Sequence, residues 1–278
     1  MGARINGTEL EWRERGSGDA VLLIHGFPLN SAMWGAQLTA LSTDWRVIAP
    51  DLRGFGASEL GSPDVALGMD LLARDLAGLL DHLGIERAVV CGLSMGGYVA
   101  FEFFRQFRDR VRALVLCDTR AGQDPVETQR ARGTLAERVT AENTIDPVIE
   151  GLLPKLVSSR TTRRNPGVVA MVRAMMQEAA PDSVARALHS MATRADSEPL
   201  LRTIDVPTLV LVGSDDVITN RGQAEMMARG IRGARLEIVP GAGHLPPVEQ
   251  PEEFNQFLNQ FLDDLPANAL PAPPLLAY

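Results

Sequence analysis

The sequence is poor in the features that mark several common classes of protein. Basic residues are outnumbered, since 27 lysines and arginines stand against 35 aspartates and glutamates, for a formal net charge of −8. No basic stripe interrupts this acidic background, so nucleic acid is not expected as a partner. The balance of 45% hydrophobic and 22% charged residues is that of a globular protein and excludes a disordered or coiled-coil chain.

Long uninterrupted apolar segments are also missing. The longest apolar stretch, Ala88 to Phe104, contains several glycines and Glu102, so it predicts a buried strand and helix and not a membrane span. The N-terminus has no apolar region typical of a secretory signal. We therefore expect a cytoplasmic protein that does not bind a membrane.

Cysteine is scarce, and the usual motifs for bound metals and nucleotides are lacking. Cys91 and Cys117 are the only cysteines, and both lie in apolar strand-like runs, which predicts buried free thiols. There is no His-x-x-x-His pair for zinc, no G-x-G-x-x-G and no Gly-Lys-Ser/Thr. We expect no cofactor and no metal.

What the sequence does contain is a series of short apolar runs with β-branched residues. Asn6-Gly7 precedes them and predicts a hairpin, because this pair tolerates the positive φ of a type I′ turn. Near-continuous apolar strands are typical of a parallel sheet that is covered on both faces. The runs are residues 21–24, 47–49, 88–91, 113–116, 208–212 and 236–239.

Amphipathic segments alternate with these runs. Residues 70–83 carry leucines at three- and four-residue steps and end at Gly84, a pattern that predicts a helix with a glycine C-cap. Residues 95–107 and 252–262 follow a similar pattern. Strands alternating with helices predict an α/β fold with a doubly wound, mostly parallel sheet.

The alternation stops between residues 120 and 196, where helix starts replace strand signals. Asp146-Pro147 and Asn165-Pro166 each pair an N-cap residue with a helix-starting proline, and Ser183 is a further candidate start. We expect a helical cap at 120–196, inserted into a core formed by 1–119 and 197–265. The tail, 266–278, is rich in proline, alanine and leucine and is expected to be extended over the surface or disordered.

The strongest chemical signal is Gly92-Leu93-Ser94-Met95-Gly96, placed between a predicted strand and a predicted helix. This is the context of a nucleophile elbow, in which flanking glycines permit a sharp turn that lifts the serine out of the sheet. A serine hydroxyl needs an oriented base to act as a nucleophile. Ser94 is therefore the candidate nucleophile.

A base and an acid follow Ser94 in the chain order expected on this fold. His244 comes directly after the last predicted strand, and Asp215 and Asp216 come after the strand before it. Because these loops leave the carboxyl ends of strands, they can meet at one edge of the sheet. Either aspartate can orient His244 on this evidence.

An early loop, His25-Gly26-Phe27-Pro28, follows the first predicted parallel strand. An oxyanion hole on this fold takes one backbone N–H from this loop and one from the residue after the nucleophile, so we assign those donors to Phe27 and Met95. His25 itself is expected to be structural. Asp51 and Arg53 are expected to brace a loop as an ion pair.

Together these motifs resemble the α/β-hydrolase fold superfamily with a helical cap. The resemblance is carried by the segments 25–28, 51–58, 92–97, 213–216 and 241–244. It implies a catalytic triad, and in that family the acid usually stands three residues after the glycine, which selects Asp216. The serine elbow and short cap are most similar to esterases, lactonases and 3-oxoadipate enol-lactonase-like enzymes. A serine nucleophile argues against haloalkane dehalogenases and epoxide hydrolases, which use an aspartate.

The expected function is hydrolysis of small, largely apolar esters or lactones, including acyl lactones, through an acyl-enzyme. Trp34 and the cap methionines Met171 and Met175 are the candidate pocket residues, because methionine lines adaptable apolar sites. The cap arginines Arg160, Arg163 and Arg164 suggest the alternative of an enol-lactonase with an anionic substrate. A perhydrolase, a C–C bond hydrolase and a non-catalytic binding protein on the same fold are further alternatives. The chain is expected to be a monomer or homodimer.

Overall fold

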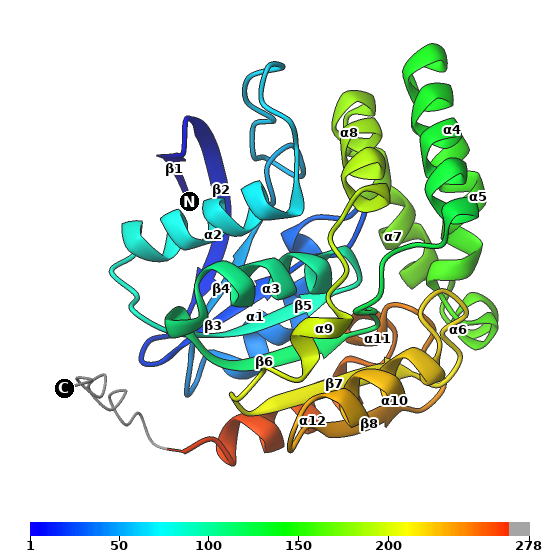
Figure 1. Ribbon diagram of the computed structural model, residues 1–278. Coiled ribbons are helices and arrows are strands. Elements are labelled where there is room, and N and C mark those ends of the chain that lie inside the picture. The colour runs from blue at the N-terminus through cyan, green and yellow to red at the C-terminus, as the bar shows by residue number, and fades with distance from the viewer. Residues whose placement is uncertain (267–278) are drawn as a thin grey trace.

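A computed structural model describes residues 1–266, so the predicted tail at 266–278 lies almost entirely outside the described residues. Eight strands form one sheet in the order β1-β2-β4-β3-β5-β6-β7-β8 (Figure 1). The strands are β1 (Gly2–Ile5), β2 (Thr8–Arg15), β3 (Ala20–Ile24), β4 (Arg46–Pro50), β5 (Ala88–Leu93), β6 (Val111–Cys117), β7 (Thr208–Gly213) and β8 (Arg235–Val239). The mostly parallel α/β sheet predicted from the sequence is confirmed.

The antiparallel part of the sheet begins with its N-terminal hairpin. Ile5 pairs with Thr8, and the turn between them has φ of 47° at Asn6 and 81° at Gly7. These positive values match the type I′ turn that Asn-Gly favours. β2 then pairs antiparallel with β4, and every later pair is parallel.

The central strands are buried along their whole length, as their apolar sequences require. β3, β5 and β7 show no partly exposed residue. Cys91 on β5 and Cys117 on β6 are fully buried free thiols, with their Sγ atoms 3.8 Å apart. The apolar runs therefore build the core, and the polar chemistry is left to the loops.

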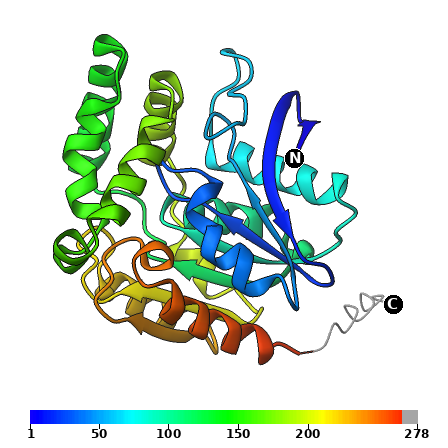
Figure 2. The same ribbon diagram turned by 180° about the vertical axis from the view of Figure 1, so that it is seen from behind.

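Helices cover both faces of the sheet. α2, α3 and α10 lie on the face seen in Figure 1, and α1 and α12 lie on the face seen in Figure 2. Gly84, with φ of +66°, follows α2 as the predicted C-cap glycine. The helices outside the segment between β6 and β7 are η1 (Ser31–Trp34), α1 (Gly35–Leu41), α2 (Met69–His82), α3 (Met95–Gln106), η2 (Arg108–Arg110), α10 (Arg221–Gly230), α11 (Pro246–Glu249) and α12 (Pro251–Asp263).

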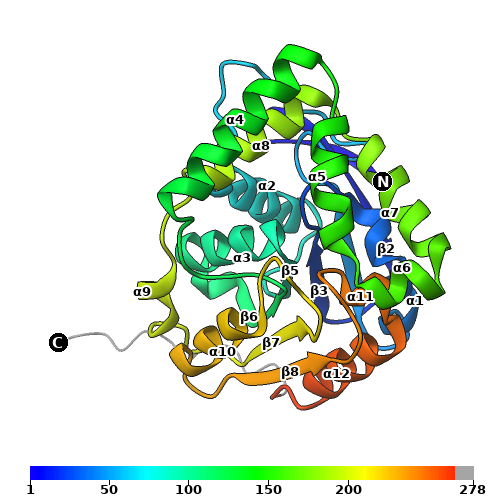
Figure 3. The same cartoon turned by 90° about the vertical axis from the view of Figure 1, so that its right-hand side faces the viewer.

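Between β6 and β7 the chain forms a separate group of helices, which Figure 3 shows beside the sheet. They are α4 (Val126–Glu142), α5 (Asp146–Leu156), α6 (Ser159–Arg164), α7 (Pro166–Gln177) and α8 (Pro181–Ala192), and the short α9 (Glu198–Leu201) leads back to β7. α4 to α8 fall within the predicted insertion at 120–196, and we call them the cap.

The predicted helix starts in the cap are corrected in two places. α8 begins at Pro181, so Ser183 lies inside its first turn; proline sets the φ of a first helical residue and fixes the start there. α5 begins at Asp146 with Ile145 as its N-cap, so Asp146 is a helical residue and not the cap. Across residues 1–266, none of the helices combines the length and apolar character needed to cross a bilayer.

Candidate active site

Ser94 occupies the sharp turn between β5 and α3. Its backbone has φ of 55° and ψ of −113°, a strained conformation for a residue other than glycine. The turn is possible because of its neighbours: a Cβ at Gly92 would lie 2.2 Å from the Gly96 carbonyl oxygen, and a Cβ at Gly96 would lie 2.3 Å from that of Ile24. Ser94 thus stands at the N-terminus of α3, where the helix dipole favours negative charge.

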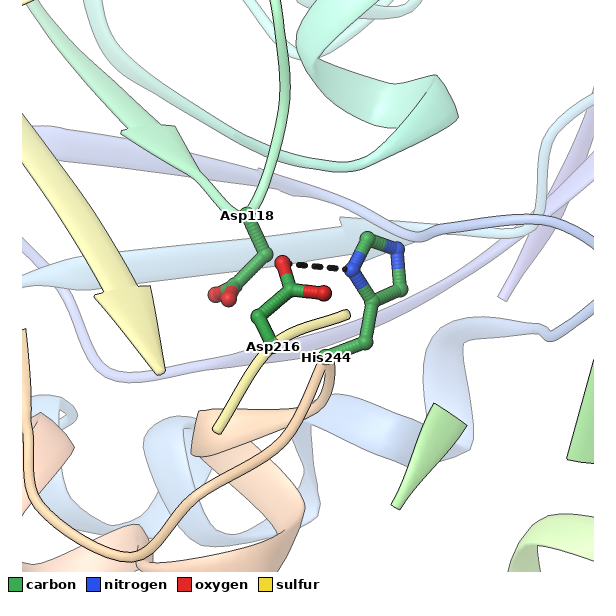
Figure 4. Close-up of side chains that lie close together, drawn as sticks. All are labelled: Asp118, Asp216 and His244. Carbon is green, nitrogen blue, oxygen red and sulfur yellow. Dashed lines mark hydrogen bonds and ion pairs between the residues drawn. The ribbon is translucent and has the colours of Figure 1, made fainter. Parts of the chain in front are cut away.

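His244 and Asp216 form a buried pair at the ends of β8 and β7. His244 Nδ1 lies 2.9 Å from Asp216 Oδ2 (Figure 4), and the two residues are 1% and 6% exposed. His244 also lines the cavity that Ser94 lines. Because Nδ1 is engaged with the carboxylate, Nε2 is the ring nitrogen left to act as a base.

The Asp216 carboxylate is held by several donors. Oδ1 accepts from the backbone N–H groups of Ile218 at 2.7 Å and Thr219 at 3.1 Å, and Oδ2 accepts from the Thr219 hydroxyl at 2.7 Å. Burial by itself would raise the pKa of Asp216, but the charge of His244 and these hydrogen bonds hold it well below its usual value. Asp216 is therefore an anion, whereas Asp215 is exposed and accepts from Ser214.

The loop that carries His244 is fastened to the cap by a buried carboxylate that the sequence motifs did not reveal. Glu249 accepts from the amides of Gly243 at 2.8 Å and Leu245 at 3.3 Å on one oxygen. Its other oxygen accepts from the Ser158 amide at 2.8 Å and the Thr161 hydroxyl at 2.6 Å. Glu249 thus ties both neighbours of His244 to the start of α6.

The cavity at Ser94 and His244 has a volume of about 460 Å³ and lies between the sheet and the cap. Most of its wall is apolar, which suits the acyl part of an ester or lactone. The apolar lining residues include Phe27, Leu135, Val148, Leu152, Leu156, Leu188, Met191, Val217 and Ile218.

The predicted pocket residues lie elsewhere. Trp34 is fully buried and packs against Phe254, with ring centroids 6.2 Å apart. Met171 is 45% exposed, and Met175 is buried on α7. None of these three lines the cavity, where the cap contributes Met191 as its methionine. The arginines Arg160, Arg163 and Arg164 do not line it either.

Three other cationic side chains line the cavity, Arg120, Arg132 and Lys155, and no acidic side chain among residues 1–266 does. Lys155 is the one lysine in the sequence. Arg132 lies 2.7 Å from the buried Asp124, which also pairs with Arg194 at 2.9 Å and, more loosely, with Arg120 at 3.8 Å. One carboxylate thus neutralises one of three guanidinium groups, and this end of the cavity keeps a positive charge.

The predicted oxyanion donors are on the loop after β3 and at the start of α3. Phe27 lines the cavity, and Met95 is the first residue of α3, directly after Ser94. Within residues 1–266, the N–H groups of Phe27 and Met95 have no hydrogen-bond acceptor. Two free amides at this position are what an oxyanion hole requires.

The residues around 51–58 brace loops, but through different partners from those expected. Arg53 pairs with Asp75 at 2.7 Å instead of with Asp51. Asp51 accepts from the amides of Ser31 at 2.7 Å and Ala57 at 3.0 Å. His25 is buried, its Nε2 accepts from the Leu52 amide at 3.0 Å, and burial lowers its pKa, so it is a neutral structural residue.

Comparison with known proteins identifies the family of the chain. Residues 21–257 match the model of the alpha/beta hydrolase family. The curated protein 3-oxoadipate enol-lactonase 2 of Acinetobacter baylyi is 28% identical over 236 residues, which cover 85% of each chain. The chain belongs to the alpha/beta hydrolase family.

Two solved structures show more precisely which branch of the family the chain resembles. A thermophilic esterase from Thermogutta terrifontis, with malate bound, is 44% identical with a TM-score of 0.92, covering 95% of this chain and 99% of that one. The enol-lactonase from Burkholderia xenovorans LB400 is 30% identical with a TM-score of 0.87, covering 95% and 100%. The chain stands in the esterase and lactonase branch, as its motifs predict.

Proposed function

We propose that this carboxylic ester hydrolase works through Ser94, His244 and Asp216, with a covalent acyl-enzyme intermediate. The observation that carries the proposal is the buried Asp216–His244 pair, whose imidazole lines the cavity that Ser94 lines. A serine at a strained strand-to-helix turn becomes nucleophilic when an oriented imidazole accepts its proton.

The reaction follows from the roles of these groups. Ser94 Oγ attacks the carbonyl carbon of the ester or lactone while His244 Nε2 takes its proton, and Asp216 stabilises the imidazolium. The N–H groups of Phe27 and Met95 donate to the oxyanion. His244 then gives the proton to the leaving alkoxide, which departs as an alcohol or, for a lactone, stays tethered to the acyl group. Water deprotonated by His244 attacks the acyl-enzyme and releases the acid.

The first candidate substrate is a small, largely apolar ester or lactone. Apolar residues of the core and cap form most of the cavity wall, and a volume of about 460 Å³ suits a small molecule. Leu188 and Met191 from α8 face this cavity together with Val148 and Leu152 from α5. An acyl chain is stabilised there by removal of its surface from water.

The second candidate is an ester or lactone that carries a carboxylate. Arg120, Arg132 and Lys155 support it, because a cavity with three cations and no acidic lining residue attracts anions in a chain of net charge −8. A guanidinium group binds a carboxylate through two parallel hydrogen bonds. The relatives named as enol-lactonases and the malate-bound esterase are consistent with this candidate.

Two measurements test these proposals. A serine-reactive phosphonate should leave a single adduct on Ser94, read by mass spectrometry, and its absence on folded protein would favour a non-catalytic binding protein. A matched pair of aryl esters, identical except that one acyl chain ends in a carboxylate, then compares kcat/KM. A preference for the neutral ester supports the first candidate, and a preference for the anionic ester supports the second.

Product analysis separates the remaining alternatives. A perhydrolase would form a peracid when hydrogen peroxide is added, whereas a C–C bond hydrolase would cleave a β-diketone-type substrate and leave simple esters intact. Cytoplasmic location and a monomeric or homodimeric state stay predictions.

A further inference from the structure

Asp118 is a buried acidic residue that the mechanism above does not use. It directly follows β6, and in Figure 4 its side chain lies beside that of Asp216, on the side away from the imidazole. Asp118, Asp216 and His244 each place a side-chain N or O atom within 4.8 Å of those of the other two. Asp118 is 1% exposed, so water does not solvate its carboxyl group.

The two neighbouring carboxyl groups differ in the number of donors they meet. Asp216 accepts four hydrogen bonds, as an anion requires. Asp118 accepts one, from the Gly213 amide to Oδ1 at 2.9 Å, and no donor among the described residues reaches its buried Oδ2. A bare carboxylate oxygen is costly in the interior, whereas a protonated Oδ2 is itself a donor and needs only an acceptor.

The charges that face Asp118 also favour its protonated form. Asp216 faces it from the loop after β7, Glu249 from α11, and the Cys117 thiol precedes it on β6. Burial and the charge of Asp216 raise the pKa of Asp118 well above its usual value, and the charge of Glu249 adds to them, against the opposing effect of the Gly213 N–H. His244 is the nearby group that becomes a cation, and it does so only when protonated.

We propose that Asp118 is a positioning residue, held as a neutral carboxylic acid whose Oδ2–H donates a hydrogen bond to the Asp216 carboxylate. This proposal rests on the proposed role of Asp216 as the acid of the triad. The added donor fixes the carboxylate that orients His244, and it does so without a second negative charge beside the imidazole. Two carboxyl groups this close cannot both be ionised at low cost.

Infrared difference spectroscopy tests the protonation state directly. The wild-type enzyme at neutral pH should show the carbonyl-stretch band of a protonated carboxylic acid, shifted in D₂O, and Asp118→Asn should remove it. Ser94→Ala should retain the band, because the band does not depend on turnover. Failure of the proposed catalytic function therefore stays distinguishable from failure of this proposal. If Asp118→Asn removes no such band, the proposal is wrong.

The pH dependence of kcat/KM tests the consequence for His244. Asparagine keeps an acceptor for Gly213 and a donor toward Asp216, so kcat/KM of Asp118→Asn should stay within about threefold of wild type, with the midpoint of the acidic limb unchanged within about 0.3 pH units. If Asp118 were ionised, asparagine would remove a negative charge near the imidazole, and that midpoint would fall by about one unit.

Truncation tests the positioning role itself. Because φ at Asp118 is +42°, glycine removes the carboxyl group without backbone strain, where alanine would add strain. Asp118→Gly should lower kcat about tenfold and leave KM unchanged, and the asparagine variant should restore kcat. Wild-type kcat in a folded Asp118→Gly enzyme would overturn the positioning role. If that variant does not fold, the infrared band and the asparagine pH profile decide the proposal.

Discussion

The sheet and the cap contribute to this enzyme in different ways. Three strands beneath the site, β3, β5 and β7, are fully buried, so the loops that carry Phe27, Ser94 and Asp216 are held by a rigid support, whereas β8, which leads to His244, is partly buried. In contrast, α4 has 17 residues, of which only Ala136 and Val139 are buried. A helix held by so narrow an apolar face adds little to the core but brings polar side chains to the cavity. We therefore propose that the loops of the sheet carry out the reaction and that the cap selects the substrate.

Specific hydrogen bonds connect the core of the molecule to the cap. Glu249 joins the His244 loop to the start of α6, and the His244 amide donates to the Leu156 carbonyl at the end of α5 at 3.0 Å. The early loop also reaches the cap, because Asn30 donates to Glu178 at 2.6 Å. The cap is therefore held to the core directly beside His244.

The largest expected effect comes from removing Ser94, the proposed nucleophile on the sheet side. Ser94→Ala should lower kcat by about five to six orders of magnitude, because the remaining donors cannot replace covalent catalysis. The measurement is steady-state ester hydrolysis. Ser159→Ala, at an exposed cap serine, should keep the wild-type rate. A near wild-type rate in the Ser94 variant would rule out the mechanism.

Replacing the acid should come next. Asp216→Asn should lower kcat by about 10⁴, because an amide cannot hold the imidazole in the required tautomer or stabilise its cation. The adjacent exposed Asp215→Asn is the matched control and should remain active. Equal losses in the two variants would contradict the assignment of the acid.

The contacts between the His244 loop and the cap should affect activity less than the triad does and more than exposed cap residues do. Glu249→Gln places an amide N–H among four donors and loosens both neighbours of His244. We expect kcat/KM to fall about 10- to 100-fold, the range seen when a group that orients a metal ligand is removed. Glu252→Gln, exposed at the start of α12, is the control. Unchanged kinetics in Glu249→Gln would show that the His244 loop does not need this tie.

Changes in the cap cavity should affect the choice of substrate and not the chemistry. Lys155→Met should raise KM for an ester with a carboxylate about tenfold and leave a neutral ester of the same length unchanged, because one favourable charge interaction is lost. Arg163→Gln, a cap arginine outside the cavity, should change neither substrate. Parallel changes for both esters in Lys155→Met would contradict an anionic substrate.

The variant with the smallest expected effect on activity, Asp118→Asn, should change stability instead. The folded-state pKa of Asp118 is raised above its unfolded value of 3.8, so the folded protein keeps a proton that the unfolded chain releases, and this group costs stability as pH rises above that value. Asp118→Asn has no such loss and should become progressively more stable than wild type between about pH 4 and about pH 7. Denaturant unfolding across this range measures it, and parallel curves for the two proteins would contradict the prediction.

Features that depend on neighbouring residues could be predicted well. The apolar runs, the Asn6-Gly7 hairpin and the glycines around Ser94 act within a few residues, so their pattern is enough. Arg53 shows where prediction from the sequence fails, because its partner Asp75 lies on α2 and nothing near Arg53 in the sequence indicates this pairing. The cavity cations were missed for a similar reason: α4 is polar on most of its surface, so periodicity does not select the side on which Arg132 lies.

The sequence by itself determined the order of strands and helices, the strained serine turn and the loops that carry a histidine and an aspartate. Those features arise from apolar periodicity and from the backbone freedom of glycine, which act locally. Only the tertiary structure decided that Asp118 lies beside Asp216, that Glu249 holds the His244 loop, and that one lysine and two arginines share a cavity. These outcomes depend on which buried polar groups meet across strands and helices, and that is fixed by packing of the whole chain.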